Sequence, residues 1–235
     1  MDYFIFKEIS SQDFDGLVVS SLPPITKPSM RVEEITIDGK DGSQYKELGY
    51  SSYEKTIEIV KLKEIDIEEI KSWLDGEGRL ILSNERDKYY NAKIIEDIDY
   101  SRFKLFNKDK ITFSIQPFKY SLIDTKKTYN IDEEQQIIIR NNGNVNSKPL
   151  ITITGTGIIN LSLNGEQLFI IDMSSEQEIT IDLEDMNAYN NTTKILKNRL
   201  IIGNYDNFQL KSGKNIISWT GTITKIEIEN YSRWI

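Results

Sequence analysis

Isoleucine is so frequent in this sequence that it restricts the secondary structure the chain can form. Of the 235 residues, 38 are isoleucine and only two, Ala92 and Ala188, are alanine. The β-branched isoleucine side chain packs well on the pleated surface of a sheet, whereas alanine favours helices most strongly. A mainly helical protein is rarely so poor in alanine, so we expect a mainly β fold.

Three segments alternate apolar and polar residues with a period of two: residues 111–116, 151–154 and 225–229. Such alternation places one row of side chains on a core and the other row in solvent. We therefore predict half-buried strands at these positions.

Two turn signals follow predicted strands. Asp38-Gly39 comes after residues 31–37, and Asn164-Gly165 lies between residues 160–163 and 167–171. Both dipeptides favour the type I′ turn of a tight hairpin, which connects antiparallel strands. Antiparallel sheets are therefore predicted.

Two glycine-containing motifs resemble ligand-binding loops without having their spacing. Gly155-Thr156-Gly157 lacks the third glycine of a dinucleotide-binding fingerprint and is flanked by alternating segments, so we interpret it as a turn or bulge. Residues 38–42 lack the acidic spacing of a calcium loop, and a hairpin turn explains them better.

One segment has the spacing of a helix. Ile67, Ile70, Trp73 and Leu74 share one face, and Asp66 and Glu69 form a capping-box pattern before Gly76 at the end. This predicts a short helix over residues 67–75. Residues 183–189 indicate a second helix through acids in the first turn, although few apolar positions there have helical spacing.

The length fits one large or two small domains, and we take two as the working count. Pro117 is expected to end the strand 111–116, and the polar stretch 124–130 precedes a new β-rich pattern. We therefore predict an N-terminal β-barrel or sandwich domain over residues 1–122, with the helix, and a C-terminal antiparallel β-sandwich over residues 123–235.

The chain has neither cysteine nor histidine. Disulfides, zinc sites built on these residues, cysteine nucleophiles and histidine-dependent triads are thereby excluded. An enzyme would depend on paired carboxylates, as glycosidases do. Because neighbouring acids usually lie in solvent, we interpret these pairs as surface charge and predict no catalytic, cofactor-binding or metal-binding residue: Glu33-Glu34, Glu68-Glu69, Glu96-Asp97, Glu133-Glu134 and Glu184-Asp185.

The net charge is -8 and the isoelectric point is near 4.9. Nucleic-acid binding needs clustered Lys and Arg, and the sequence has no such stripe. No stretch approaches the roughly 20 apolar residues of a membrane-spanning helix. The N-terminal residues carry an acid where an export signal carries bases, so we expect no export signal. From the charge and the apolar stretches together we expect no membrane contact and no specific nucleic-acid binding.

Four aromatic residues divide into two groups. Trp73 lies on the apolar face of the predicted helix, and Trp219 alternates with Ile217, so both are predicted in the core. Tyr89 and Tyr90 are adjacent in a predicted strand, where neighbours face opposite sides. One of the two is therefore expected to be exposed, as at a protein interface.

The order of several motifs resembles that of the distal tail (Dit) proteins of long-tailed phages, also called the phage tail component family. The resemblance covers nearly the whole chain, and no single motif is diagnostic. Its motifs are Leu48-Gly49-Tyr50, residues 53–59, residues 70–74, residues 76–83, residues 87–93, Gln116-Pro117-Phe118 within residues 113–120, Asn142-Gly143-Asn144, residues 149–153, Gly155-Thr156-Gly157, Leu163-Asn164-Gly165 and residues 210–221.

This resemblance implies an N-terminal domain related to tail-tube proteins and a C-terminal galectin-like β-sandwich. It implies a non-enzymatic virion protein at the tail tip, the baseplate hub, of a siphovirus or prophage-derived particle made in a bacterial cytoplasm. Family members form homohexameric rings that join the tail tube to the tail-associated lysin or tip protein and often to receptor-binding proteins. No cofactor is implied. Fold alone does not transfer sugar binding, and the histidine of galectin-type sugar sites is missing.

Two hypotheses follow by analogy. The hairpin around Asp38-Gly39 and the loop 40–49 are expected near ring contacts, and the acidic balance is expected to give a channel that repels DNA phosphates. A neutral or basic channel would contradict the second hypothesis. The alternative function is an adhesin-like β-sandwich that binds cell-surface glycans, and a carboxylate-dependent glycosidase ranks third.

Overall fold

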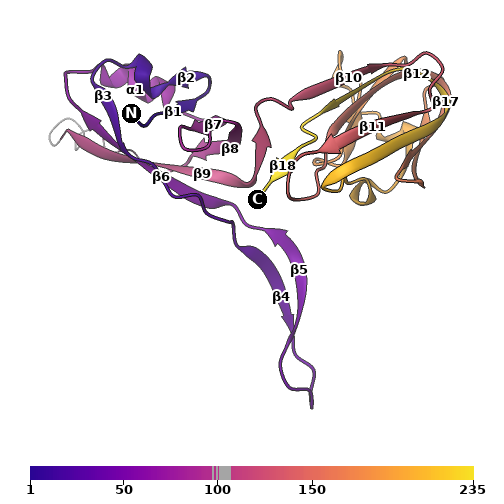
Figure 1. Cartoon of the computed structure of the whole chain (residues 1–235), viewed down its shortest axis with the longest axis horizontal. Coiled ribbons are helices and arrows are strands. Elements are labelled where there is room, and N and C mark those ends of the chain that lie inside the picture. Colours follow the sequence, from indigo (N-terminus) through magenta and orange to yellow (C-terminus); the bar gives the residue numbers. More distant parts are fainter. Residues whose placement is uncertain (97, 99, 101–106) are drawn as a thin grey trace. The chain divides into compact units, whose positions relative to one another are not determined.

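The computed structural model describes residues 1–96, 98, 100 and 107–235 (Figure 1). They form two compact units, residues 1–119 with Ile235 and residues 120–234. Antiparallel sheets make up most of both units, and the described part of the chain contains one α-helix. The predicted mainly β class is therefore confirmed.

The first unit contains a sheet with strand order β2-β1-β7-β8-β9-β6-β3 and a separate two-stranded sheet of β4 and β5. Its elements are β1 (Phe4–Phe6), β2 (Ile9–Ser10), the 3-10 helix η1 (Ser11–Asp13), β3 (Leu17–Ser21), β4 (Met30–Ile35), β5 (Gln44–Tyr50), β6 (Tyr53–Lys61), α1 (Ile67–Trp73), β7 (Glu77–Leu82), β8 (Lys88–Ile94) and β9 (Lys108–Ser121).

The helix α1 begins at Ile67 as predicted and ends at Trp73, two residues before the predicted end. The side chain of Asp66 accepts a hydrogen bond from the Glu68 N–H at 2.9 Å, which caps the first turn. Trp73 is buried, stacks on Phe4 and Phe14, and donates from its indole nitrogen to the Phe6 carbonyl at 2.9 Å. The single helix therefore closes one aromatic core against the sheet.

The second unit contains the remaining strands (Figure 1). Its elements are β10 (Lys126–Asn130), β11 (Gln136–Asn141), β12 (Leu150–Leu163), β13 (Glu166–Asp172), β14 (Glu178–Asp182), β15 (Asn187–Tyr189), the 3-10 helices η2 (Asn198–Leu200) and η3 (Tyr205–Asn207), β16 (Ile201–Gly203), β17 (Gly213–Glu229) and β18 (Arg233–Trp234).

The two long strands β12 and β17 each belong to both halves of this second unit. The start of β12 and the end of β17 pair with β14 and β10, whereas their other ends pair with β13 and β11. Side chains from both halves pack into one apolar cluster. The unit is therefore a sandwich whose long strands pass from one layer to the other, as strands do at sandwich corners.

Glycines occupy the point where β12 and β17 change layers. The pairing register shifts at Gly155 and again after Thr156, so the predicted turn or bulge in this motif is confirmed as a bulge. Gly221 has a φ of +94°, and a Cβ there would lie 2.3 Å from the Ile158 carbonyl oxygen. Only glycine fits this close approach of two backbones.

The two predicted tight hairpins have different outcomes. Asn164 and Gly165 have φ values of 52° and 88° and directly join β12 to β13, which confirms the type I′ turn. The turn at Asp38-Gly39 is closed by a Lys40 N–H to Ile37 carbonyl bond of 3.1 Å, but only Gly39 has a positive φ. This hairpin is therefore not type I′, and eight residues separate its strands.

Two other expectations are wrong. The strand β9 continues through Pro117, because its pairing with β6 ends at Ile115 and the proline removes no donor from that ladder. Residues 183–189 form turns followed by β15 rather than a helix. The Asp182 carboxylate accepts the N–H groups of Glu184 and Asp185 at 3.0 Å each, so this acid stabilises a turn.

The predicted burial of the tryptophans is confirmed, whereas the prediction for the tyrosine pair is wrong. Trp219 is buried with Ile217. Tyr89 and Tyr90 are both buried, at 2% and 0% exposure. The Arg79 guanidinium lies 4.6 Å from the centre of the Tyr89 ring and covers the side chain that alternation places outside the core.

Candidate assembly surfaces

The hairpin formed by β4 and β5, here called the arm, pairs with no other described strand. Its two strands are joined by a backbone ladder from Met30–Tyr50 to Ile35–Gln44 and by a 3.4 Å ion pair between Lys46 and Glu33. Most of its side chains are exposed. An isolated two-stranded hairpin is only marginally stable in water, so contact with a partner would stabilise the arm.

Several large apolar side chains of the arm are exposed. Val32, Ile35, Ile37, Tyr45 and Leu48 are 41–62% exposed. Apolar side chains on an unpartnered hairpin with free edges form a strong interaction surface. Residues 38–49, where ring contacts were expected by analogy, form the turn and most of the second strand of the arm.

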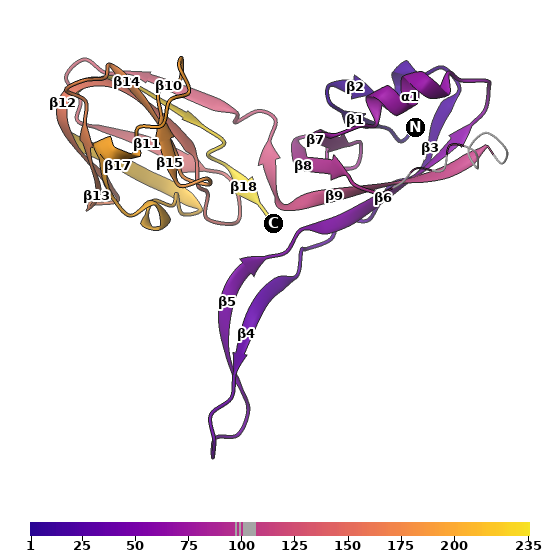
Figure 2. The ribbon, with the colours of Figure 1, turned by 180° about the vertical axis from the view of Figure 1, so that it is seen from behind.

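The root of the arm is fixed to the first unit. The Ser51 N–H donates to the Ser29 carbonyl at 2.9 Å, which closes the hairpin where it meets β6. Tyr50 packs edge-on against Phe118 with ring centres 5.7 Å apart, and the Lys27 ammonium lies 5.8 Å from the Tyr50 ring centre. Figure 2 shows β5 leading into β6 through this root.

A buried group of charges lies near the arm root, and we call it the lysine cluster: Lys55, Glu85, Tyr90 and Lys119. The Lys119 ammonium and the Glu85 carboxylate are 2.8 Å apart, with side chains only 7% and 9% exposed. The Tyr90 hydroxyl donates to the other carboxylate oxygen of Glu85. The Glu85 carboxylate therefore binds Lys119 and Tyr90 directly, and its charge also acts on the ammonium of Lys55, a residue that is 2% exposed.

The lysine cluster fixes the segment that leads to the arm. The Lys55 ammonium donates to the Pro24 carbonyl at 2.8 Å, and the Asn84 amide donates to the Pro23 carbonyl at 3.2 Å. Burial lowers the pKa of Lys55, and the charge of Glu85 partly opposes this effect. The lysine cluster was not predicted from the sequence, although Lys55 alternates with the buried Ile57 and Ile59 and could have been placed on the core face.

Tyrosines in both units are expected to make the fold sensitive to alkaline pH. Burial and the Glu85 charge raise the pKa of Tyr53 to about 12, and burial raises the pKa of Tyr100 and Tyr231 to about 12. An acid whose folded pKa is raised stabilises the fold below its unfolded pKa, near 10, and loses that contribution as pH rises towards 12. Urea unfolding between pH 9 and pH 12 should show falling stability, and Tyr53→Phe should reduce the slope. An unchanged slope in this variant would contradict the assignment.

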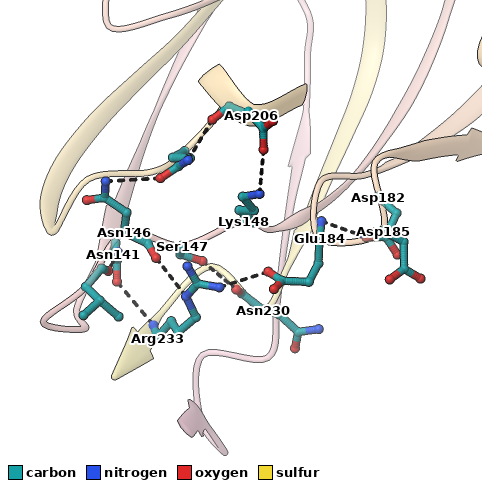
Figure 3. Close-up of polar contacts among 12 residues, drawn as sticks. Asn141, Asn146, Ser147, Lys148, Asp182, Glu184, Asp185, Asp206, Asn230 and Arg233 are labelled. Atoms are coloured by element: carbon teal, nitrogen blue, oxygen red, sulfur yellow. Dashed lines mark hydrogen bonds and ion pairs between the residues drawn. The ribbon is translucent and has the colours of Figure 1, made fainter. Parts of the chain in front are cut away.

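The end of the second unit is held by a polar network around Arg233. Its side chain donates to the Asn146 carbonyl at 2.8 Å and to the Glu184 carboxylate at 2.9 Å (Figure 3). The Asn141 side chain bridges the Val145 carbonyl and the Gly143 N–H, each at 2.8 Å. A Cβ at Gly143 would lie 1.8 Å from the Arg233 carbonyl oxygen. The motif Asn142-Gly143-Asn144 therefore belongs to a loop that packs closely against the backbone of β18.

The outer faces of the two sandwich layers differ in charge. On the layer with β10, Lys126 forms ion pairs with Glu227 at 3.2 Å and Glu229 at 3.4 Å. The centre of the other face consists of uncharged cross-strand pairs, which are Ile138 with Ile216, Ser162 with Ser218, Asn160 with Thr220 and Ile170 with Ile202. Ile138 and Ile202 are 50% and 69% exposed. Depletion of charge with exposed apolar groups is typical of the centre of a protein interface.

The acid pairs singled out in the sequence do not come together as a site. All their members within the described residues are exposed, and Asp97 lies outside that part of the chain. The described residues contain no group of three or more acidic side chains that could hold a metal ion, and no described helix is long and apolar enough to cross a membrane.

No protein-family model matches the sequence, and neither does any curated protein. Solved structures do match. The SPP1 Dit protein, described as a paradigm of the hub adsorption apparatus of phages infecting Gram-positive bacteria, has a TM-score of 0.70 and 14% identity, with 100% of both chains covered. A chain of the activated phage P2 baseplate with calcium has a TM-score of 0.58 and 9% identity, covering 100% of this chain and 98% of that one.

A chain of the same baseplate with strontium has a TM-score of 0.53 and 10% identity, covering 97% of this chain and 98% of that one. At these identities the likeness establishes the fold. The resemblance drawn from the motifs is thereby confirmed in three dimensions, and this chain has the fold of the phage distal tail (Dit) proteins.

Proposed function

We propose that this protein is a non-enzymatic component of a phage or prophage-derived tail, located at the tail tip. The observation that carries the proposal is the full-length correspondence with a Dit protein described as part of a hub adsorption apparatus. Both units take part in this correspondence, because each chain is covered completely. A match confined to one unit would have supported only a shared domain.

In this proposal six copies form a closed ring that joins the tail tube to the tip proteins. The N-terminal domain, residues 1–122, forms the ring. The C-terminal galectin-like domain, residues 123–235, binds receptor-binding proteins outside the ring. A ring of identical copies needs a heterologous contact, in which one surface of each copy meets a different surface of the next. The exposed arm supplies the first of these surfaces.

The second domain serves as a docking platform for receptor-binding proteins in this proposal. Its uncharged outer face, with Ile138 and Ile202 exposed, is suited to burial against another protein. The salt-bridged outer face of the other layer is suited to solvent, because Lys126 is already paired with two glutamates. The tail-tube protein and the tail-associated lysin or tip protein are the partners of the ring itself.

Light scattering on the purified chain tests the ring. Six copies of 27.3 kDa give about 164 kDa, and we expect this species to grow as the protein concentration rises. The -8 charge of each copy makes association weaker at low salt, so the measurement should include physiological ionic strength. A 27.3 kDa monomer at every concentration would contradict self-assembly of the ring.

A further inference from the structure

The strand β6 has one edge that is only partly covered. On one side it pairs with β9 over residues 53–60, whereas on the other side β3 covers only residues 58–61. Residues 53–57 of β6 therefore have no described strand beside them on the β3 side, at the edge of the sheet.

The direction of the free backbone groups follows from the bonds at the end of β6. The Lys61 N–H donates to the Asn107 carbonyl at 2.8 Å on the β9 side, and the Leu62 N–H donates to the Gly16 carbonyl at 2.8 Å on the β3 side. Alternate residues of a strand direct these groups to opposite edges. Thr56 and Glu54 are separated from Leu62 by an even number of residues. They thus direct their N–H and C=O groups to the same side as Leu62, which is the uncovered edge.

These four backbone groups have no protein partner among the described residues. In the chain that follows β3, Pro23 and Pro24 have no N–H to donate to the two free carbonyls. Their own carbonyls accept from the side chains of Asn84 at 3.2 Å and Lys55 at 2.8 Å. The double proline and the lysine cluster therefore hold this segment away from the edge of β6.

The result is a slot of about 330 Å³ between the edge of β6 and the proline segment. Leu22, Pro23 and Thr26 line one wall, and Glu54, Lys55 and Thr56 line the other. Unpaired strand edges are sites where an extended segment can add to a sheet through main-chain hydrogen bonds. The slot has the geometry of such a site.

The chain also contains the complementary feature. Each strand of the arm has a free outer edge and exposed apolar side chains, and the arm needs a partner for stability. An arm cannot enter its own slot, because only Ser51 and Ser52 separate β5 from β6 and the Ser51–Ser29 bond continues the hairpin to that point. The arm therefore extends away from the start of β6, at Tyr53, and does not run back along this strand (Figure 2).

We propose that the slot beside Glu54 and Thr56 accepts one strand of the arm from a second copy of this chain. The inference rests on the proposed ring and assigns the second surface of its heterologous contact. The arm of one copy cannot reach the slot of the same copy. Each arm therefore pairs with the slot of the next copy, and the series of contacts closes as a ring.

Disulfide trapping tests the contact directly, because the natural chain has no cysteine. A Glu54→Cys preparation is mixed with preparations carrying single cysteines at positions 31–35 or 44–48, and oxidised mildly. Opposite residues in an antiparallel pair bring their Cβ atoms within about 4.5–5.5 Å, close to disulfide range. We expect reducible mixed dimers at alternate positions of one arm strand, and none with Glu77→Cys, which lies on β7 opposite Lys93 of β8 and away from the slot.

A second pair of variants tests the main-chain bonds. Glu54→Pro removes an N–H that faces the slot and leaves the ladder to β9 intact, whereas Glu54→Ala keeps that N–H. We expect Glu54→Pro to weaken assembly at least tenfold in light scattering and Glu54→Ala to leave it nearly unchanged, with equal melting temperatures. If rings of about 164 kDa form without any cross-link to position 54 and both variants assemble equally, the slot contact is wrong while the ring stands. If no assembly forms at all, both proposals fall.

Discussion

Replacing Glu85 with alanine is expected to destabilise the first unit more than any exposed charge change. The substitution leaves the buried Lys119 ammonium without its carboxylate partner, removes the acceptor of Tyr90 and takes away the negative charge that acts on the buried Lys55. Removing one partner of a buried ion pair typically costs about 3–5 kcal/mol. Hydrogen exchange of the β6, β8 and β9 amides should therefore report an opening free energy lower by about that amount.

The matched control is Glu58→Ala. Glu58 also pairs with a lysine, Lys110, at 2.9 Å, but the two side chains are 46% and 68% exposed. Exposed ion pairs contribute little to stability, so this variant should exchange almost like the natural chain. Equal losses for Glu85→Ala and Glu58→Ala would show that burial of the lysine cluster does not govern the stability of the first unit.

The second large effect is expected at the corner of the sandwich. Gly221→Ala puts a Cβ 2.3 Å from the Ile158 carbonyl oxygen at a φ of +94°. Backbone strain and overpacking together should lower the free energy of unfolding of the second unit by about 3–5 kcal/mol. Urea or thermal unfolding, with exchange of the β12 and β17 amides, measures this loss.

Gly165→Ala separates the clash from the strain. Gly165 has a similar φ of +88°, but a Cβ added there would have no atom within 4 Å. The variant should cost only the left-handed backbone term, about 1–2 kcal/mol. If both alanine variants lose the same stability, the close approach of β12 and β17 is not what requires glycine at position 221.

Local patterns predicted those parts of the fold that depend on local physics. The type I′ turn at Asn164-Gly165 formed because both residues adopt positive φ and the flanking strands pair directly. The turn type at Asp38-Gly39 was predicted wrongly, because eight residues connect β4 to β5 there and no core supports that connection. Trp73 was placed correctly because helical spacing and core burial agree there.

Features created by distant residues were not predictable from local patterns. Tyr89 is buried because Arg79, from the neighbouring strand β7, covers its ring. The lysine cluster joins residues from β6, β8, β9 and the turn before β8, and only the fold brings Lys119 to Glu85. The slot beside Glu54 depends on where β3 ends relative to β6, which is a matter of register. Strand pairing over long sequence separations therefore sets the surfaces proposed to assemble.

Electron cryomicroscopy of the native particle tests the central claim most directly. The account predicts six copies of this chain in a closed ring at the junction of tail tube and tail tip, with each arm lying against the neighbouring copy. Density for this chain anywhere else on the particle, or a junction built without it, would contradict the account.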